Sequence, residues 1–412
     1  MRDQIERFAL KLKNKSSGLK IRRNVLIGTN NWMYLHQGHQ KQFDYLSGEL
    51  KVERKSIENF VSNIRNRTAF FKEQSITYRH IVFPSKPLVQ KQYLPGPYCN
   101  IRSLFDTYYR PELGRWEENV VYPLDTLSQL EKSASTFLKY NTHNSDLGYL
   151  SVCNQLIGAL GFTPFDEQTY FDRKEIAVGG DLTAMLNSQD TNIETFLVPK
   201  QGIDFGYAFG NRRYIPGNTN DVLIFHNQSA LTSRRVLVFG DSFFKGLLRY
   251  FRLLFTDVVY MRSTFIHRDI VDCYQPDVVF TGNAERYLAS VESDDTANHF
   301  LLSLYGNPNY KPDAIYLDAL RAMLSFRHYP HIYNDWAKKI EKGAHANPIR
   351  VSPPYDKADI LREVALYFEN RGDMDTAHAV MSEALSLRPN VPFLNQKCNE
   401  YVLEKLSWKK IK

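Results

Sequence analysis

The stretch Val236-Leu-Val-Phe-Gly-Asp-Ser-Phe243 decides the fold that we expect for this chain. Its first four residues are apolar and partly β-branched, which predicts a short buried strand. Gly240 permits the tight turn or close backbone approach that ends such a strand. From Phe243 to Phe255 the apolar residues recur at helical spacing. The stretch therefore predicts a strand, a turn and a helix, with Ser242 at the beginning of the helix.

Asp241 and Ser242 have two interpretations. Both are good N-cap residues, so capping of the helix alone explains them. In the other interpretation Ser242 is a nucleophile, and the backbone N–H groups at the positive end of the helix stabilise an oxyanion. A serine hydroxyl needs an adjacent general base for this chemistry, usually a histidine that a third group orients.

The segment Tyr140-Asn-Thr-His-Asn-Ser-Asp146 offers such a base in His143. Asn141 lies two residues before His143, and in an extended segment both side chains point the same way. None of the other histidines among the 11 in the sequence has comparable neighbours. Ser242, His143 and Asn141 are therefore the candidate catalytic residues, as nucleophile, base and orienting group.

These motifs resemble those of the SGNH-hydrolase-like O-acetyltransferases of the alginate acetylation type. In that family an Asp-x-His motif precedes a Gly-Asp-Ser motif, as Asn141-Thr-His143 precedes Gly240-Asp-Ser242 here. The other similar segments, in chain order, are Gly28-Thr-Asn-Asn-Trp-Met-Tyr-Leu35, Ile81-Val-Phe-Pro-Ser-Lys-Pro87 with Tyr93-Leu-Pro95, Gly180-Asp-Leu182, and Gln275-Pro-Asp-Val-Val279 with Glu285-Arg286-Tyr287-Leu288.

The resemblance implies an α/β fold with an SGNH-like (flavodoxin-like) parallel sheet covered by helices. The alternation of strand and helix patterns predicts the same class. The resemblance also implies acyl transfer through Ser242, whose backbone N–H is expected in the oxyanion hole. The further candidates for oxyanion or substrate binding are Asp241, Gly180, Asp181, Arg262 and Arg286, although the two arginines could equally form structural ion pairs.

One departure from the family lies at Asn141, where the family has aspartate. Asparagine can accept a hydrogen bond from the imidazole and fix its tautomer. It cannot stabilise the imidazolium with a full charge, so activity is expected to fall unless another acid substitutes. Asp146 is the nearest candidate. The tryptophan that follows the histidine in the family is also replaced, by Asn144.

Composition indicates a globular protein that binds no nucleic acid. The chain has 412 residues, 43% hydrophobic and 24% charged, enough for two domains or one large domain with an appendage. Its net charge of +7 suits an anionic partner such as a charged polysaccharide, coenzyme A phosphates or a membrane surface, or is simply solubilising. The sequence contains no basic run or zinc spacing, so neither a nucleic acid nor a metal is expected.

The N-terminal sequence lacks the apolar region of a signal peptide, and no apolar run is long enough for a membrane span. Residues 1–15 predict a basic amphipathic helix, which either packs on the protein or touches a membrane surface. We therefore expect a cytoplasmic or membrane-peripheral protein. That location favours acetyl-CoA as the acetyl donor, with no bound cofactor.

Three regions are expected: a catalytic domain (1–330), a linker (331–355) and a helical region (356–412). In the last region, small and apolar residues match the spacing of one tetratricopeptide repeat: Leu361, Ala365, Phe368, Gly372, Ala377, Met381, Ala384 and Pro389. One copy is too short for a solenoid, and an ordinary helical hairpin explains the pattern as well. The repeat interpretation suggests a protein partner or self-association.

The function that follows is O-acetylation of hydroxyl groups on a bacterial capsular polysaccharide or exopolysaccharide. A carbohydrate acetyl esterase would use the same serine chemistry, because motifs do not decide whether water or sugar accepts the acyl group. A glycan-binding or scaffolding protein with a weakened site is the third alternative, suggested by Asn141 and the repeat-like tail.

Overall fold

The computed structural model describes residues 19–38, 40–215, 217–297, 300, 310–327, 329–343, 357–370 and 372–409. The chain forms two compact units, each built from several segments. Unit 1 comprises Met1–Phe205, Ser229–Ile266 and Asp277–Ala297, and unit 2 comprises Gly206–Gln228, His267–Pro276 and Asn298–Lys412. The predicted helix at residues 1–15 lies outside the described residues.

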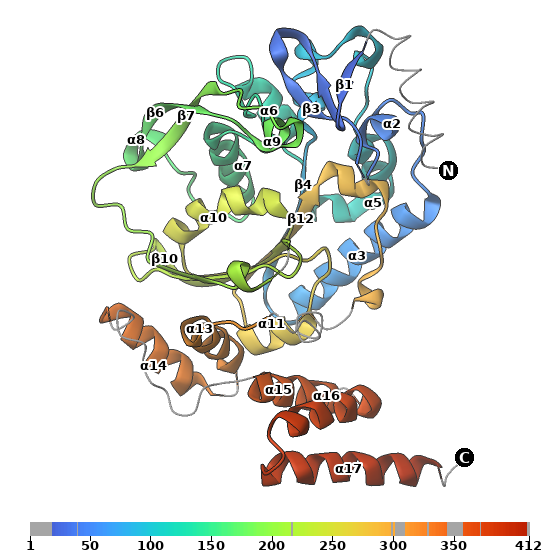
Figure 1. Cartoon of the computed structure of the whole chain (residues 1–412), viewed down its shortest axis with the longest axis vertical. Helices are drawn as coiled ribbons and strands as arrows, with labels where there is room; N and C mark the ends of the chain where they lie inside the picture. Colours follow the sequence, from blue (N-terminus) through green and yellow to red (C-terminus); the bar gives the residue numbers. More distant parts are fainter. Residues whose placement is uncertain are drawn as a thin grey trace. The chain divides into compact units, whose positions relative to one another are not determined.

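Unit 1 is built on a parallel sheet (Figure 1). Its strands run in the order β5 (Val120–Val121), β4 (Thr77–Phe83), β12 (Val278–Ala284), β10 (Thr232–Gly240) and β11 (Phe255–Met261). The four long strands read as nearly continuous buried runs. Such runs are typical of parallel strands whose two faces are both covered.

Helices α7 (Asp146–Gly158) and α10 (Ser242–Leu254) cover one face of this sheet, and α3 (Arg54–Glu73) lies against the other (Figure 1). Adjacent residues of β12 illustrate the two faces, because side chains alternate along a strand. Phe280 stacks on Phe251 of α10, with ring centroids 5.0 Å apart. Thr281 contacts His80 of β4, whose ring lies 5.3 Å from that of Phe60 in α3.

Unit 1 also contains two small antiparallel sheets. They are β1–β2–β3 (Lys20–Arg22, Val25–Ile27, Met33–Leu35) and the ribbon β6–β7 (Phe171–Val178, Asn192–Pro199). The other α-helices among the described residues of the unit are short: α2 (Gln42–Leu46), α4 (Lys86–Val89), α5 (Arg110–Leu113), α6 (Leu124–Leu130), α8 (Glu167–Tyr170) and α9 (Asp181–Leu186).

Unit 2 contains an antiparallel strand pair and six helices among its described residues. The elements are β8 (Tyr207–Gly210), β9 (Val222–His226), α11 (Arg268–Tyr274), α13 (Ala314–Ser325), α14 (Pro330–Glu341), α15 (Lys357–Asn370), α16 (Met374–Leu387) and α17 (Pro392–Lys409). Ala365, Ala377 and Ala384 are fully buried, and Gly372 adopts a positive φ of 77° in the turn between α15 and α16.

The predicted α/β class is confirmed: a parallel sheet is covered by helices, and the C-terminal region is helical. Helix α6 ends at Leu130, well before the loop that carries His143. There the Glu131 carboxylate accepts hydrogen bonds from the backbone and hydroxyl of Thr136, which folds the chain into a turn. The range 331–355, which we assigned to a linker, begins within α14, and 344–356 lie outside the described residues. The three-region division stays a prediction.

Candidate active site

Ser242 lies where β10 ends and α10 begins, as the sequence predicts. Asp241 is the N-cap, and its Oδ1 accepts a hydrogen bond from Phe243 N at 2.9 Å. Its Oδ2 accepts another from Ala284 N, also at 2.9 Å, at the end of β12. A Cβ on Gly240 would lie 2.2 Å from the Phe244 ring, so only glycine fits this turn. Asp241 therefore does the capping, and the Ser242 hydroxyl is left for chemistry.

His143 lies on a loop that is bent rather than extended, contrary to our expectation for residues 141–143. Asn141 Oδ1 accepts a hydrogen bond from His143 N at 3.0 Å, which is the geometry of an Asx turn. The same oxygen lies 2.8 Å from His143 Nδ1. The two side chains thus meet through a turn, not through alternation along a strand.

The structure brings Asn141, His143 and Ser242 together in one line of contacts. His143 Nε2 lies 3.0 Å from Ser242 Oγ. A backbone N–H already donates to Asn141 Oδ1, so that atom is an acceptor and Nδ1 of the ring must donate to it. The neutral ring therefore carries its proton on Nδ1 and directs the Nε2 lone pair at the serine hydroxyl. This is the tautomer that a general base for serine requires.

Asp181 supplies a negative charge beside this histidine. Its Oδ2 lies 3.6 Å from His143 Nδ1. Thr142 holds the carboxylate, since its N–H donates to Asp181 Oδ1 at 2.9 Å and its hydroxyl donates to Oδ2. Our expectation that Asp146 fills this place is wrong: its carboxylate accepts from Arg249 Nη1 and from a backbone N–H, each at 2.8 Å.

The surroundings of His143 keep the imidazole neutral. Burial is the main cause that lowers its pKa below the ordinary value. Asp181 and Asp241 raise the pKa, whereas Arg286 and Arg262 lower it. The net direction is downward, so at neutral pH the ring is able to accept a proton. The side chain stays 28% exposed, which leaves access for a substrate.

Gly180 places Asp181 against the histidine loop. A Cβ at Gly180 would lie 2.0 Å from Tyr140 O, so the two backbones approach as closely as only glycine allows. The Gly180 N–H donates to Thr183 Oγ1 at 2.8 Å, which engages the group that we considered for the oxyanion hole. Of the two residues suggested by the Gly-Asp-Leu segment, Asp181 contacts His143 and Gly180 provides the close approach.

Lys86 holds the backbone of the histidine loop through hydrogen bonds, a role that we did not predict from the sequence. Its buried Nζ lies within 3.0 Å of four carbonyl oxygens, those of Met33, Leu138, Lys139 and Asn141. Burial lowers the pKa of Lys86 to about 7. The rings of the Gly28–Leu35 segment flank the amine, with the Trp32 and Tyr34 centroids 5.0 and 5.4 Å from Nζ. The early motifs therefore converge on one lysine.

Two arginines lie near the other side of His143. Arg286 is in the 3₁₀ turn η7 (Glu285–Ala289), and its guanidinium lies 5.4 Å from the Phe243 ring centroid. That ring is 4.8 Å from the His143 ring. Buried Glu285 anchors the turn by accepting from Ser85 N, Phe105 N and Tyr122 Oη. In the part of the chain that the structure describes, no acceptor lies within hydrogen-bond distance of the buried Arg262 Nη1.

The described residues contain neither a metal-binding cluster nor a membrane-spanning helix. No cluster of three or more His, Cys, Asp or Glu side chains there could hold a metal ion. None of the helices in the described ranges combines the length and apolar character that crossing a bilayer requires.

Comparison with known proteins gives structural similarities at low sequence identity. Neither a protein-family model nor a curated protein matches the sequence. PatB1 from Bacillus cereus, solved with a sulfonyl adduct, is similar with a TM-score of 0.48 and 12% identity, over 66% of this chain and 97% of that one. A DHHW family protein from Eubacterium siraeum has a TM-score of 0.45 and 13% identity, over 66% and 94%. The O-acetyltransferase domain of AlgJ from Pseudomonas putida has a TM-score of 0.44 and 14% identity, over 68% of this chain and 97% of that one.

Proposed function

We propose that this protein is a serine-dependent O-acetyltransferase that acts on hydroxyl groups of a bacterial surface polysaccharide. The observation that carries the proposal is the line Asn141 Oδ1, His143 and Ser242 Oγ, with contacts of 2.8 and 3.0 Å. The tautomer that this line enforces makes Nε2 a proton acceptor at the serine hydroxyl. The resemblance of the sequence motifs to the alginate-type O-acetyltransferases supplies the class of reaction.

In the first half of the reaction, Ser242 Oγ attacks the carbonyl carbon of the acetyl donor. Its proton passes to His143 Nε2, and the carbonyl becomes an oxyanion at the N-terminus of α10. Ser242 N is at the first helical position, where amides have no intrahelical acceptor, and the helix dipole adds positive potential. The tetrahedral intermediate collapses to acetyl-serine, and the leaving thiolate or alkoxide takes the proton from the imidazolium.

In the second half, a sugar hydroxyl attacks the acetyl-serine. His143 accepts the hydroxyl proton and returns it to Ser242 Oγ as the sugar ester leaves. Both halves form an imidazolium, whose positive charge needs a partner. We assign that role to Asp181, 3.6 Å from Nδ1, which provides the full charge that Asn141 lacks. In this chain Asn141 sets the tautomer and Asp181 supplies the charge.

Arg262 and Arg286 are proposed to bind an anionic part of the donor or the acceptor. Arg262 Nη1 is a buried donor without an acceptor among the described residues, and an unused donor favours a ligand that supplies one. A uronate carboxylate or a coenzyme A phosphate has the right chemistry. Acetyl-CoA as donor, a cytoplasmic location and protein docking through the helical region 356–412 are proposals that come from the sequence.

The test is acetylation of the protein itself. The purified protein is incubated with acetyl-CoA or a generic acetyl ester and digested, and the peptide that contains Ser242 is examined by mass spectrometry. We expect a gain of one acetyl group on Ser242 and none in Ser242→Ala. Unchanged acetyl turnover in Ser242→Ala would disprove the assignment of the nucleophile.

An acetyl esterase is the second candidate, because both reactions share the acyl-enzyme. The partly exposed His143 side chain favours it, since a solvent-accessible site admits water. The two are distinguished by mixing the acetylated enzyme with polysaccharide fragments. Acetyl groups on the fragments support transfer, and free acetate alone supports the esterase.

A further inference from the structure

A cavity of about 210 Å³ lies in unit 1 on the α3 face of the sheet. Its floor is formed by buried His80, and exposed Thr264 and Ser290 are at its rim. Phe60 of α3 and Tyr287 of η7 contribute aromatic rings to its walls. The volume exceeds the roughly 150 Å³ cavity that accepts benzene and falls below the roughly 300 Å³ of small drug sites. One small ring fits it.

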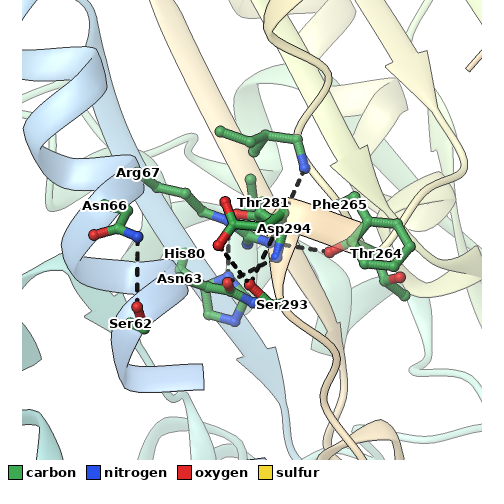
Figure 2. A network of polar contacts seen from close by, with 12 residues as sticks. Ser62, Asn63, Asn66, Arg67, His80, Thr264, Phe265, Thr281, Ser293 and Asp294 are labelled. Carbon is green, nitrogen blue, oxygen red and sulfur yellow. Dashed lines mark hydrogen bonds and ion pairs between the residues drawn. The ribbon is translucent and has the colours of Figure 1, made fainter. Parts of the chain in front are cut away.

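The positive charge of Arg67 in the cavity wall is compensated, and the exposed Glu292 adds a carboxylate to the lining. Figure 2 shows Arg67 and Asp294 facing each other beside His80. Arg67 Nε and Nη2 each lie 2.7 Å from an oxygen of the Asp294 carboxylate, and the arginine side chain is 4% exposed. Burial lowers the pKa of His80 well below its ordinary value, and Arg67 lowers it further. The floor is therefore neutral and does not recruit an anion.

A chain of hydrogen bonds fixes the tautomer of His80. The positive charge of Arg67 acts on the Tyr78 hydroxyl and by itself lowers the pKa of that group, so we infer that the phenol oxygen turns toward the guanidinium and its proton turns away. Tyr78 Oη then donates to Thr281 Oγ1 at 2.8 Å, and Thr281 Oγ1 donates to His80 Nδ1 at 2.7 Å. Nδ1 accepts, so the proton of the neutral ring is on Nε2. Among the described residues nothing accepts a hydrogen bond from Nε2, which leaves a donor for a ligand.

Asn283 provides an acceptor in the same cavity. Its Oδ1 is buried, and the described residues place no donor within hydrogen-bond distance of it. A buried acceptor left without a donor is destabilising, so a ligand that donates to it gains affinity. The cavity thus combines one donor at His80, one acceptor at Asn283 and aromatic walls.

We propose that this cavity binds one uncharged sugar residue, separately from Ser242. An apolar ligand would leave His80 Nε2 and Asn283 Oδ1 unpaired, and an anion would find no free positive charge on the floor. A sugar ring supplies hydroxyl groups that both accept and donate, and its C–H faces pack on aromatic rings. None of Asn141, His143 and Ser242 lines the cavity, so we place the sugar held here outside the reacting position.

The experiment is a titration of the full chain with neutral sugars, followed by the NMR signal of the His80 Nε2–H. Methyl glucoside, methyl galactoside and N-acetylglucosamine are the probes, with glucose phosphate as a charged comparison. Asn283→Leu removes the acceptor at nearly constant volume. Asn66→Leu is the matched control, because Asn66 lies on the exposed side of α3 and bonds Ser62 (Figure 2).

We expect at least one neutral sugar to bind saturably and to shift the His80 signal. The affinity should fall about tenfold or more in Asn283→Leu, the loss expected for one buried hydrogen bond. It should be unchanged in Asn66→Leu and in Ser242→Ala. Absence of saturable binding at tens of millimolar, equal affinity in Asn283→Leu, or a shift that disappears in Ser242→Ala each overturns the proposal. Failure here leaves the acetyl-serine test untouched.

Discussion

His80 on the α3 face of the sheet and His143 on the loop beside the N-terminus of α10 have opposite hydrogen-bonding roles. Each is partly or fully buried, has a lowered pKa, and has Nδ1 bonded to a side-chain oxygen. The partner of His143 is an amide oxygen, which only accepts, so Nε2 is a base. The partner of His80 is a hydroxyl that donates, so Nε2 carries a proton. The atom opposite Nδ1, rather than burial, decides which histidine can activate a serine.

The largest effect on activity is expected when the general base His143 is removed. We expect His143→Gln to lower kcat for acetyl transfer or ester cleavage about 10³-fold, because the serine hydroxyl loses its proton acceptor. The rate with a generic acetyl ester measures it, with circular dichroism to confirm folding. A loss of less than tenfold would mean that another group acts as the base.

Removal of the support beneath the loop has the next largest effect. Lys86→Met leaves four buried carbonyl oxygens without their shared donor, and we expect a loss of about 3 kcal/mol of unfolding free energy. Urea unfolding measures the change. Lys91→Met, at an exposed lysine close by, is the matched control and should unfold like the wild type. Equal stabilities of the two variants would exclude the supporting role of Lys86.

The charge beside His143 is tested by two substitutions with opposite signs. Activity is lost as the pH falls through the pKa of His143, because a protonated ring cannot act as a base. Asp181 raises this pKa and Arg286 lowers it. Asp181→Asn should therefore move the acid limb of kcat/KM to lower pH and reduce kcat about tenfold. Arg286→Gln should move the limb to higher pH. Shifts in the same direction would refute the assignment.

Asn141 can be converted to the residue of the related family. Asn141→Asp places a charge 2.8 Å from Nδ1, so we expect equal or higher activity and an acid limb at higher pH. The measurement is the pH profile of kcat/KM for wild type and variant side by side. A large loss would show that two adjacent carboxylates, at 141 and 181, are incompatible.

The smallest effect is expected on the α3 face. Tyr78→Phe removes the hydroxyl that donates a hydrogen bond to Thr281 Oγ1. The direction of the hydrogen bond between Thr281 and His80 Nδ1 is then no longer set, and the tautomer of His80 is no longer fixed. We expect about 1 kcal/mol of destabilisation and less than a twofold change in activity. Nitrogen NMR of the ring reads the tautomer directly. An unchanged Nε2–H signal in this variant would contradict the hydrogen-bond chain.

The sequence predicted the strand–turn–helix at Ser242, because apolar periodicity and Gly240 are local signals. It also selected His143 and Asn141, although the reason given was an extended segment and the structure has an Asx turn. Turn geometry depends on one side-chain hydrogen bond, which periodicity does not report.

Long-range contacts were beyond sequence reasoning. Asp146, three residues from His143, was expected as the substitute acid, whereas Asp181 is the carboxylate next to the ring. Proximity in sequence was a poor guide because α9 approaches the loop through Gly180. The four carbonyl contacts of Lys86 could not be predicted either, because every residue type has a backbone oxygen and the sequence does not show which of them a lysine contacts.

The second hydrogen bond of Asp241 gives the site an order of assembly. Its acceptor oxygen is paired with the N–H of Ala284, at the end of β12. That strand is the last of the unit 1 sheet in the sequence, yet it lies between β4 and β10. A nascent chain that has emerged only as far as α10 already contains Ser242 and His143, but not the strand that holds Asp241 or the turn that carries Arg286. During synthesis, the hydrogen bond that holds Asp241, the residue before the nucleophile, therefore forms only when β12 enters the sheet.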